Sequence, residues 1–424
     1  MNVVREGARA LHGNRRRGGS GFWVGQGYRA LEKPSSRLLP VCKGASSSRL
    51  LPLGLSLGSS SYQRSTHKKR KNIKVSKGSW DVSFASSTVN FVGVTAPIFL
   101  GSCHHHHRAS TRDAFRLRQY GGFWLLEKFL QGVPAVHSVF EPRPSDVLLA
   151  SFPKHGTTWL KALAFATRNR AEHPPRGLDH PLRRRNPHDI VQYLELQFAQ
   201  SMGHVVAALP SPRVLATHPP YSLLPRRITA EDLGCRIVYI CRDPKDAFIS
   251  SWFFTKKTVA AVAARAQAGE EPPPYTFAEA FKLFCDGICV SGPQWQHVLS
   301  YWEASRRQPE KVLFLRHEKM LRNPTSNVKK LAEFMGCAFS GKEEATVVVE
   351  DIVELCSLES LKNMDVNKSG SHGPLAHESF FRKGVAGDWS NHITPAMAER
   401  LDKIVEDALQ GSGLTFDVAA EPSA

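Results

Sequence analysis

The sequence lacks an apolar run long enough to cross a bilayer. The longest candidate near the amino terminus, residues 91–101, is about half the length that a transmembrane helix needs. No apolar core follows a charged start, as a secretory signal requires. We therefore expect no membrane partner and a cytoplasmic location.

Cysteine is scarce and scattered, with eight residues in 424. Cys285 and Cys289 are four residues apart, which places both on one helix face, but no second pair stands at the spacing of a zinc finger. Four adjacent histidines, His104–His107, lie in a segment where solvated side chains are the more common outcome. We expect buried thiols in a reducing compartment and no bound metal.

Acidic residues are nearly absent from the first 112 residues, which hold 19 Lys and Arg against Glu6, Glu32 and Asp81. The remainder holds 37 of the 56 basic and 35 of the 38 acidic residues. The main body is therefore close to neutral, although the whole chain carries a formal charge of +18. A protein that binds the phosphate backbone concentrates positive charge on its folded domain. The distribution argues against a nucleic-acid partner.

The basic segment 1–112 has the composition of a disordered tail. It is rich in Ser, Gly and Arg, repeats SSRLLP at residues 35–40 and 47–52, and offers too little periodic apolar surface to offset chain entropy. Two targeting functions are alternatives, since such segments resemble organelle transit peptides and HKKRK at residues 67–71 resembles a nuclear signal. An incorrect gene model is a further alternative. We expect one folded domain over residues 113–424.

Short apolar runs bounded by turn residues predict buried strands at residues 146–152, 236–240 and 311–315. Segments without helix breakers predict helices that begin at Thr157 and near Thr325. Strands that alternate with helices are typical of an α/β domain. The expected fold is a central parallel sheet flanked by helices on both sides.

The folded domain is expected to begin between Asp113 and Trp124. Apolar residues recur there at a spacing that predicts a helix, namely Phe123, Trp124, Leu125, Phe129 and Leu130. Residues 133–137 are then expected to form a loop.

The stretch SFPKHGTTWLKAL, residues 151–163, joins the first predicted strand to its helix and has the features of an anion site. Unpaired backbone N–H groups and the helix dipole favour an anion at such a junction. Gly156 permits close approach of a ligand, and Lys154 supplies a mobile charge. Two hydroxyl donors and a flat ring for a nucleotide base follow: Thr157, Thr158 and Trp159.

The loop differs from a Walker sequence, which reads GxxxxGK[ST], because its lysine precedes its glycine by two residues. This order argues against an ATP or GTP hydrolase. It favours an enzyme of nucleotide-binding fold that holds a 5′-phosphate in another way.

Four stretches, in the right order, together resemble the cytosolic sulfotransferases, with a likeness to the plant flavonol and hydroxyjasmonate enzymes. FPKHGTTWLKAL resembles the family's 5′-phosphosulfate loop, and IVYICRDPKDAFISSWFF its 3′-phosphate segment. RVLATHPPYSLLP resembles the segment that carries the catalytic histidine, and FFRKGVAGDW the last phosphate loop. The resemblance extends from about Gly121 to Thr415 and implies a P-loop-like sulfotransferase fold.

The resemblance implies a donor, 3′-phosphoadenosine 5′-phosphosulfate (PAPS), a small hydroxylated acceptor and no metal. The 5′-phosphosulfate would be held by Lys154, His155, Gly156, Thr157 and Thr158, and the adenine by Trp159. The 3′-phosphate would be held by Arg242, Ser250, Arg382, Lys383 and Gly384. An arginine fork and a hydroxyl suit such a phosphate. For Arg242, an ion pair with Asp243 or Asp246 is the alternative.

His218 is the candidate general base, because imidazole titrates near neutral pH and a hydroxyl becomes a good nucleophile only when its proton leaves. Lys154 would stabilise charge on the bridging oxygen, as in phosphoryl transfer. Three positions depart from the family pattern near the nucleotide. His155 replaces a small hydroxyl residue, His317 replaces the usual tyrosine, and Leu358 stands where some relatives have an aromatic residue against the adenine.

An acceptor pocket is expected from Tyr193, Leu194, Phe198, Tyr221 and parts of segment 255–275. Aromatic and aliphatic lining suits a small hydrophobic alcohol or phenol, although plain core packing is the alternative for each residue. The oligomeric state stays open. Two alternative functions remain, a P-loop kinase and a PAPS-binding or PAP-binding homologue with little turnover.

Overall fold

The computed structural model describes most of the chain after Arg116 and three short strands before it, covering residues 82–84, 87–89, 95–97, 116–231, 235–266, 276–373 and 375–416. The SSRLLP repeats, the HKKRK run and His104–His107 lie outside the described residues. Strands β1 (Val82–Phe84) and β2 (Ser87–Val89) pair antiparallel with each other. Strand β3 (Thr95–Pro97) pairs with β4 (Arg116–Tyr120), although the sequence indicates a disordered tail there.

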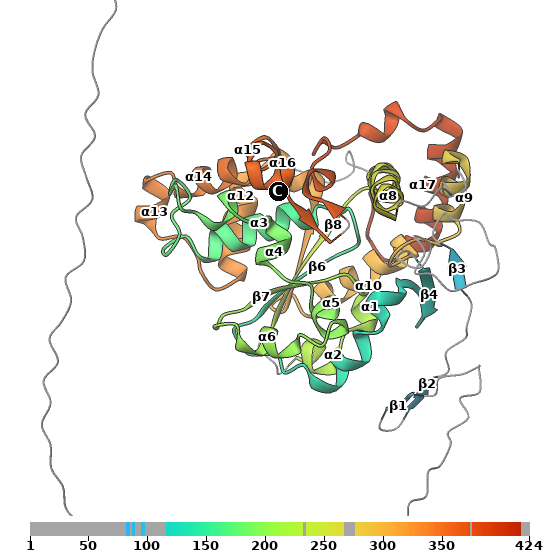
Figure 1. Ribbon diagram of the computed structural model, residues 1–424, viewed down its shortest axis with the longest axis horizontal. Coiled ribbons are helices and arrows are strands. Elements are labelled where there is room, and N and C mark those ends of the chain that lie inside the picture. Colours follow the sequence, from blue (N-terminus) through green and yellow to red (C-terminus); the bar gives the residue numbers. More distant parts are fainter. Residues whose placement is uncertain are drawn as a thin grey trace, which may run out of the picture. The chain divides into compact units, whose positions relative to one another are not determined.

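The central sheet is parallel, and its four strands are in the order β7–β6–β8–β9 (Figure 1). Their bounds are β6 (Val147–Ser151), β7 (Val214–Thr217), β8 (Arg236–Cys241) and β9 (Val312–Arg316). Every residue of β6 is buried, as expected for a strand covered on both faces. The predicted strands and the α/β fold class are confirmed.

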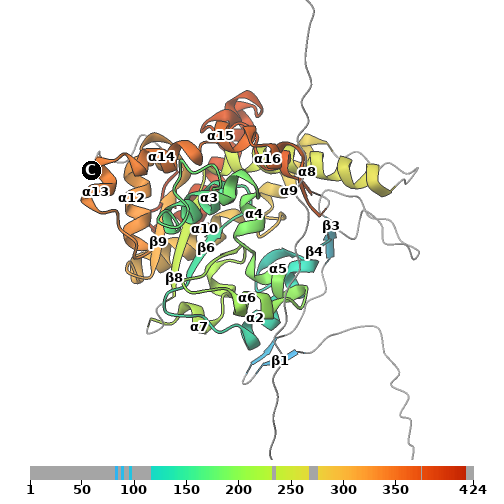
Figure 2. The same cartoon turned by 60° about the vertical axis from the view of Figure 1, so that its left-hand side comes forward.

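Helices cover both faces of this sheet because alternate strand residues point to opposite sides. Val147 and Leu149 pack with helices α3 (Thr157–Arg168), α12 (Pro324–Phe334) and α14 (Val348–Leu355), which Figure 2 shows grouped together. Leu148 and Ala150 pack on the other face. The helices there are α8 (Pro244–Ala266), α9 (Phe277–Cys285), α10 (Gln294–Arg307) and α17 (Pro395–Leu409).

Further short elements lie between these in the sequence. They include α4 (Pro187–Ile190), α5 (Leu194–Ala199), α6 (Gly203–Ala208), α7 (Arg226–Thr229), α11 (His317–Arg322), α13 (Gly341–Ala345), α15 (Leu358–Asn363), α16 (Asp365–Ser369), β10 (Ser371–His372) and β11 (Leu375–Ala376). A search of the described helices finds none with the length and apolar character of a bilayer span. Cys285 and Cys289 are buried free thiols.

The helix predicted at Phe123–Leu130 is wrong in its first half. Residues Phe123–Leu126 form strand β5, which pairs antiparallel with β4, and α1 (Glu127–Leu130) follows. Gly121 and Gly122 join the strands with φ of 56° and 85°, as a two-residue hairpin turn requires. The predicted loop at 133–137 is also wrong, because α2 (Val133–Val139) begins there with proline in its first turn.

Candidate active site

The carboxyl ends of β6, β7 and β8 border a cavity of about 780 Å³. Phe152, His218 and Arg242 line it from the residues that follow each strand. This is where ligands of open parallel sheets gather. The described lining residues include no carboxylate, and their positive charge comes from Lys128, Lys154, Arg242, Arg382 and Lys383. The cavity therefore favours an anionic ligand.

The loop between β6 and α3 brings its backbone close to the cavity through a left-handed turn. Lys154 has φ of 69° and Gly156 has φ of 101°, and a Cβ atom at Gly156 would lie 2.9 Å from Cδ2 of His317. The Ser151 and Thr157 hydroxyl oxygens are 2.6 Å apart, which ties the strand to the first turn of the helix. The first N–H groups of α3 have no partner within the helix, so they are available to an anion.

Lys154 holds its ammonium group over aromatic rings. Its Nζ atom lies 3.9 Å from the centroid of Phe254 and 5.9 Å from that of Phe380. Burial, together with the nearby charges of Arg242 and Arg382, lowers the pKa of Lys154 to about 7. An anion in the cavity would reverse this effect and restore the full charge.

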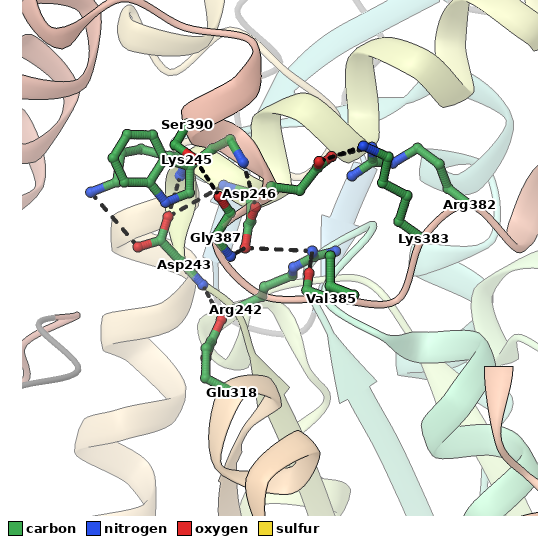
Figure 3. A network of polar contacts seen from close by, with 12 residues as sticks. Arg242, Asp243, Lys245, Asp246, Glu318, Arg382, Lys383, Val385, Gly387 and Ser390 are labelled. Carbon is green, nitrogen blue, oxygen red and sulfur yellow. Dashed lines mark hydrogen bonds and ion pairs between the residues drawn. The ribbon is translucent and has the colours of Figure 1, made fainter. Parts of the chain in front are cut away.

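Arg242 faces the loop that follows Arg382 (Figure 3). Its Nη2 donates to the Val385 carbonyl at 2.8 Å and lies 3.6 Å from Oδ2 of Asp246, so the ion pair considered for Arg242 is formed. The Nε atom of Arg242 is buried without a hydrogen-bond partner. Because orphaned buried donors are rare, this atom is a candidate contact for a ligand oxygen.

Two carboxylates hold the loop from outside the cavity lining. Asp246 is fully buried and accepts hydrogen bonds from the backbone N–H groups of Gly387 at 2.8 Å and Trp389 at 3.0 Å. Asp388 forms ion pairs with Arg382 and with Lys383, the latter at 2.7 Å. These contacts fix the orientation of the Arg382 and Lys383 side chains. Ser250 and Gly384 line the cavity beside them.

His218 follows β7 and has one ring nitrogen committed to the backbone. Its Nδ1 lies 2.7 Å from the Ser151 carbonyl oxygen. Because a carbonyl only accepts, Nδ1 carries the hydrogen, and Nε2 of the neutral ring keeps its lone pair. Burial lowers the pKa of His218 to about 3, although the bond to Ser151 acts to raise it. The ring is therefore neutral near pH 7.

The backbone of His218 is held from two sides. Glu195 accepts its N–H at 3.0 Å and also the Thr217 hydroxyl at 3.1 Å. The His297 Nε2 atom donates to the His218 carbonyl at 2.9 Å. The imidazole is thus presented in one orientation.

Trp159, His317 and Leu358 line the same cavity, with His317 against Gly156 and Leu358 against Gly384. The Trp159 and His317 rings meet edge to face with centroids 5.6 Å apart. Burial lowers the pKa of His317 to about 3, with Arg242 as the next cause, so the ring is neutral near pH 7. Its Nδ1 atom is buried without a partner.

Four of the proposed ligand contacts do not reach the cavity. His155 is fully buried, with Nε2 at 3.3 Å from the Gln294 amide nitrogen and its ring against Phe152. Leu194 and Phe198 pack in the hydrophobic core, and the Tyr221 hydroxyl lies 3.4 Å from the Thr229 carbonyl. All four are absent from the cavity lining, so core packing explains them.

Tyr193 does line the cavity, and its ring centroid lies 4.6 Å from that of His218. Sequence reasoning missed Phe254, Phe380 and His188, which also line it. The position of Phe254 was predictable, since it follows Ser250 by four residues on one helix and therefore shares its face. No local pattern marks His188.

Comparisons with known proteins give one consistent family. The family model described as "Sulfotransferase domain" matches residues 144–413. Cytosolic sulfotransferase 10 of Arabidopsis thaliana is 40% identical over 309 residues, which cover 71% of this chain and 89% of the relative.

Solved structures agree with this result. The crystal structure of a sulphotransferase from Arabidopsis thaliana has 34% identity and a TM-score of 0.56, and the match covers 72% of this chain and 90% of that one. A mouse sulfotransferase crystallised with PAP has 24% identity and a TM-score of 0.52, and the match covers 70% of this chain and 96% of that one. The mouse protein shares the fold.

Replacing Asp246 by asparagine should loosen the loop that carries the cations. An amide offers one acceptor in place of two and leaves Arg242 without its charge partner, so we expect a loss of about 2–4 kcal/mol of stability. Hydrogen exchange should show the Gly387 and Trp389 amides exchanging at least about tenfold faster. Asp407→Asn, in the exposed pair with Lys403 on α17, is the control. Equal exchange in both variants would refute the role of Asp246.

Proposed function

The chain belongs to the plant cytosolic sulfotransferase family, and on that premise we propose that it transfers a sulfuryl group from PAPS to the hydroxyl of a small hydrophobic or phenolic acceptor. The proposal depends on one observation. Lys154, Arg242 and the His218 imidazole line a single cavity whose described lining has no carboxylate. The relatives are named cytosolic, which supports a cytoplasmic location. Organelle targeting through residues 1–112 remains the alternative.

The residues present fit a bisphosphorylated nucleotide. The first-turn N–H groups of α3, Lys154 and the Thr157 and Thr158 hydroxyls would hold the 5′-phosphosulfate. Arg242, with its unpartnered Nε, would hold the 3′-phosphate together with Ser250, Arg382, Lys383 and Gly384. Trp159 and His317 would contact the adenine. PAPS supplies an activated sulfuryl group when bound.

His218 would accept the proton of the acceptor hydroxyl at Nε2, since Nδ1 is engaged with Ser151. A pKa of about 3 makes it a weak base in the ligand-free protein. The negative charge of a bound donor would raise the proton affinity of the imidazole. Lys154 would place its ammonium against the bridging oxygen, where charge develops during transfer.

The acceptor would lie against the apolar part of the cavity. Its lining includes Phe129, Tyr193, Phe248, Trp252, Phe284 and Val290. Such a surface suits a phenol or a hydrophobic alcohol, whose hydroxyl is the polar group to be oriented. Of segment 255–275, Thr255 lines the cavity, and residues 267–275 lie outside the described part.

The alternative of a nucleotide-binding homologue with little turnover rests on His155 and His317. His155 is directed toward Gln294 and is absent from the cavity lining, so it would leave room for the sulfate of the bound donor. The alternative of a kinase is not retained, because the chain belongs to a sulfotransferase family.

Transfer of ³⁵S-labelled sulfate from PAPS to a panel of phenols and hydrophobic alcohols tests the proposal. We expect product with the natural protein and a fall in kcat of about 10²–10⁴-fold in His218→Asn, because the amide can replace Nδ1 but not the basic Nε2. The dissociation constant of PAP, the product nucleotide, should be unchanged by calorimetry. Tight PAP binding without product across the panel would favour the inactive homologue.

The affinity for PAP should depend on pH through Lys154. Its pKa of about 7 in the free protein would be raised by a bound phosphate, so affinity should fall about tenfold per pH unit above pH 7. The fall should stop near the pKa of the bound state. Titration calorimetry between pH 7 and 9 measures this, with Lys154→Met as the variant that should lose the slope. A slope retained in that variant would exclude Lys154 as its cause.

A further inference from the structure

Three polar side chains form a chain behind the donor loop. The Thr158 hydroxyl lies 2.8 Å from Nε2 of His188, and the Nδ1 atom of the same ring lies 3.2 Å from Nζ of Lys161. Thr158 and Lys161 are three residues apart on α3 and therefore share one face of the helix. Thr158 and His188 line the cavity, whereas Lys161 is fully buried behind them.

The His188 ring is fixed in place by its surroundings. Asn186 caps α4 by accepting the His188 backbone N–H at 2.9 Å, and the Asn186 amide donates to Asn367 at 2.8 Å. The ring packs on Phe380, with centroids 4.3 Å apart, and stacks on Tyr193 at 5.6 Å. Burial lowers the pKa of His188 well below its usual range, with the charge of Lys161 as the next cause. The imidazole is therefore neutral and carries one N–H.

Lys161 has hydrogen-bond partners but no ion pair with a carboxylate of the described residues. Its Nζ donates to the Val191 carbonyl at 2.8 Å and lies 3.4 Å from the Tyr193 ring centroid. Burial lowers its pKa, while Glu195 and Asp189 act to raise it. The group keeps N–H hydrogens in either protonation state, so it can donate to Nδ1 of His188.

The direction of these bonds decides what Thr158 offers to a ligand. When Lys161 donates to Nδ1, the single ring hydrogen sits on Nε2 and is donated to the Thr158 oxygen. The Thr158 hydrogen is then free to point into the cavity. In the opposite tautomer, Thr158 would donate to His188 and present only lone pairs to an anion, which is repulsive.

We propose that Lys161 and His188 are positioning residues that hold the Thr158 hydroxyl as a hydrogen-bond donor toward the 5′-phosphate of the bound nucleotide. The inference rests on the proposed function, because the proposed function assigns the 5′-phosphate to the loop between β6 and α3. It extends the donor site by two residues that touch no reacting atom.

The test compares two nucleotides that differ at the 5′ position only, PAP and adenosine 3′-phosphate. The natural protein should bind PAP more tightly. His188→Leu should lower the affinity for PAP about tenfold, which corresponds to the loss of one hydrogen bond to a charged group. The affinity for adenosine 3′-phosphate should be unchanged. His188→Gln should recover most of the loss, since its amide N–H can replace Nε2–H. If His188 had only a structural role, the variant would lower the affinity for both nucleotides by the same factor.

A double-mutant cycle shows whether the effect passes through Thr158. Thr158→Val should also lower the affinity for PAP and leave that for adenosine 3′-phosphate unchanged. The double variant Thr158→Val with His188→Leu should bind PAP no more weakly than Thr158→Val alone. Additive losses would overturn the proposal. Nitrogen-15 NMR of His188 in the natural protein with PAP requires no variant. A hydrogen on Nε2 is expected, and a hydrogen on Nδ1 would overturn the proposal.

The binding measurements distinguish a wrong role for Lys161 and His188 from a wrong proposed function. If the natural protein prefers PAP and His188→Leu keeps that preference, only the role of Lys161 and His188 is refuted. If the natural protein binds both nucleotides equally, the 5′-phosphate does not contact the loop. That result would overturn both the donor-site assignment and the inference built on it.

Discussion

The site depends on an excess of positive charge facing the cavity at the carboxyl ends of a parallel sheet. Lys154 and Arg242 reach the cavity from the ends of adjacent strands, and the described cavity lining contains no carboxylate, because the Asp246 carboxylate that pairs with Arg242 lies outside that lining. Burying such charges is unfavourable, as the pKa of about 7 at Lys154 indicates. An anionic ligand would offset this cost, and the bisphosphorylated nucleotide of the proposed function is such a ligand.

The carboxylates that keep this arrangement stable lie behind the cationic side chains. Asp246 binds the backbone of the loop, and Asp388 pairs with Arg382 and Lys383. The loop is thereby held without a negative charge in the ligand's path. In the proposed site, the Lys161–His188–Thr158 chain would act at the other end, because Lys161, buried behind the lining, would orient His188 and through it the Thr158 hydroxyl.

Three strands of the central sheet and the tight turn before α3 were predictable from the sequence, because both are encoded locally. A strand buried on both faces is a short apolar run, and Gly156 with two threonines marks the helix start beside it. Phe123–Leu126 was misassigned because four apolar residues fit either period, and the Gly121–Gly122 turn decided the outcome. Phe198 and Tyr221 pack against the core and are absent from the cavity lining, because packing partners far along the chain determine which way a side chain points. His188 was not predicted for the same reason.

The central claim is that one cavity binds a nucleotide at both of its phosphates, with the His218 imidazole facing the transferred group. A crystal structure of the protein with PAP tests it most directly. We expect the 5′-phosphate at the Lys154 loop, the 3′-phosphate within hydrogen-bond distance of Arg242, and Nε2 of His218 open to the space beside the 5′-phosphate. A nucleotide bound with either phosphate away from these cations, or with His218 screened from it, would refute this binding mode.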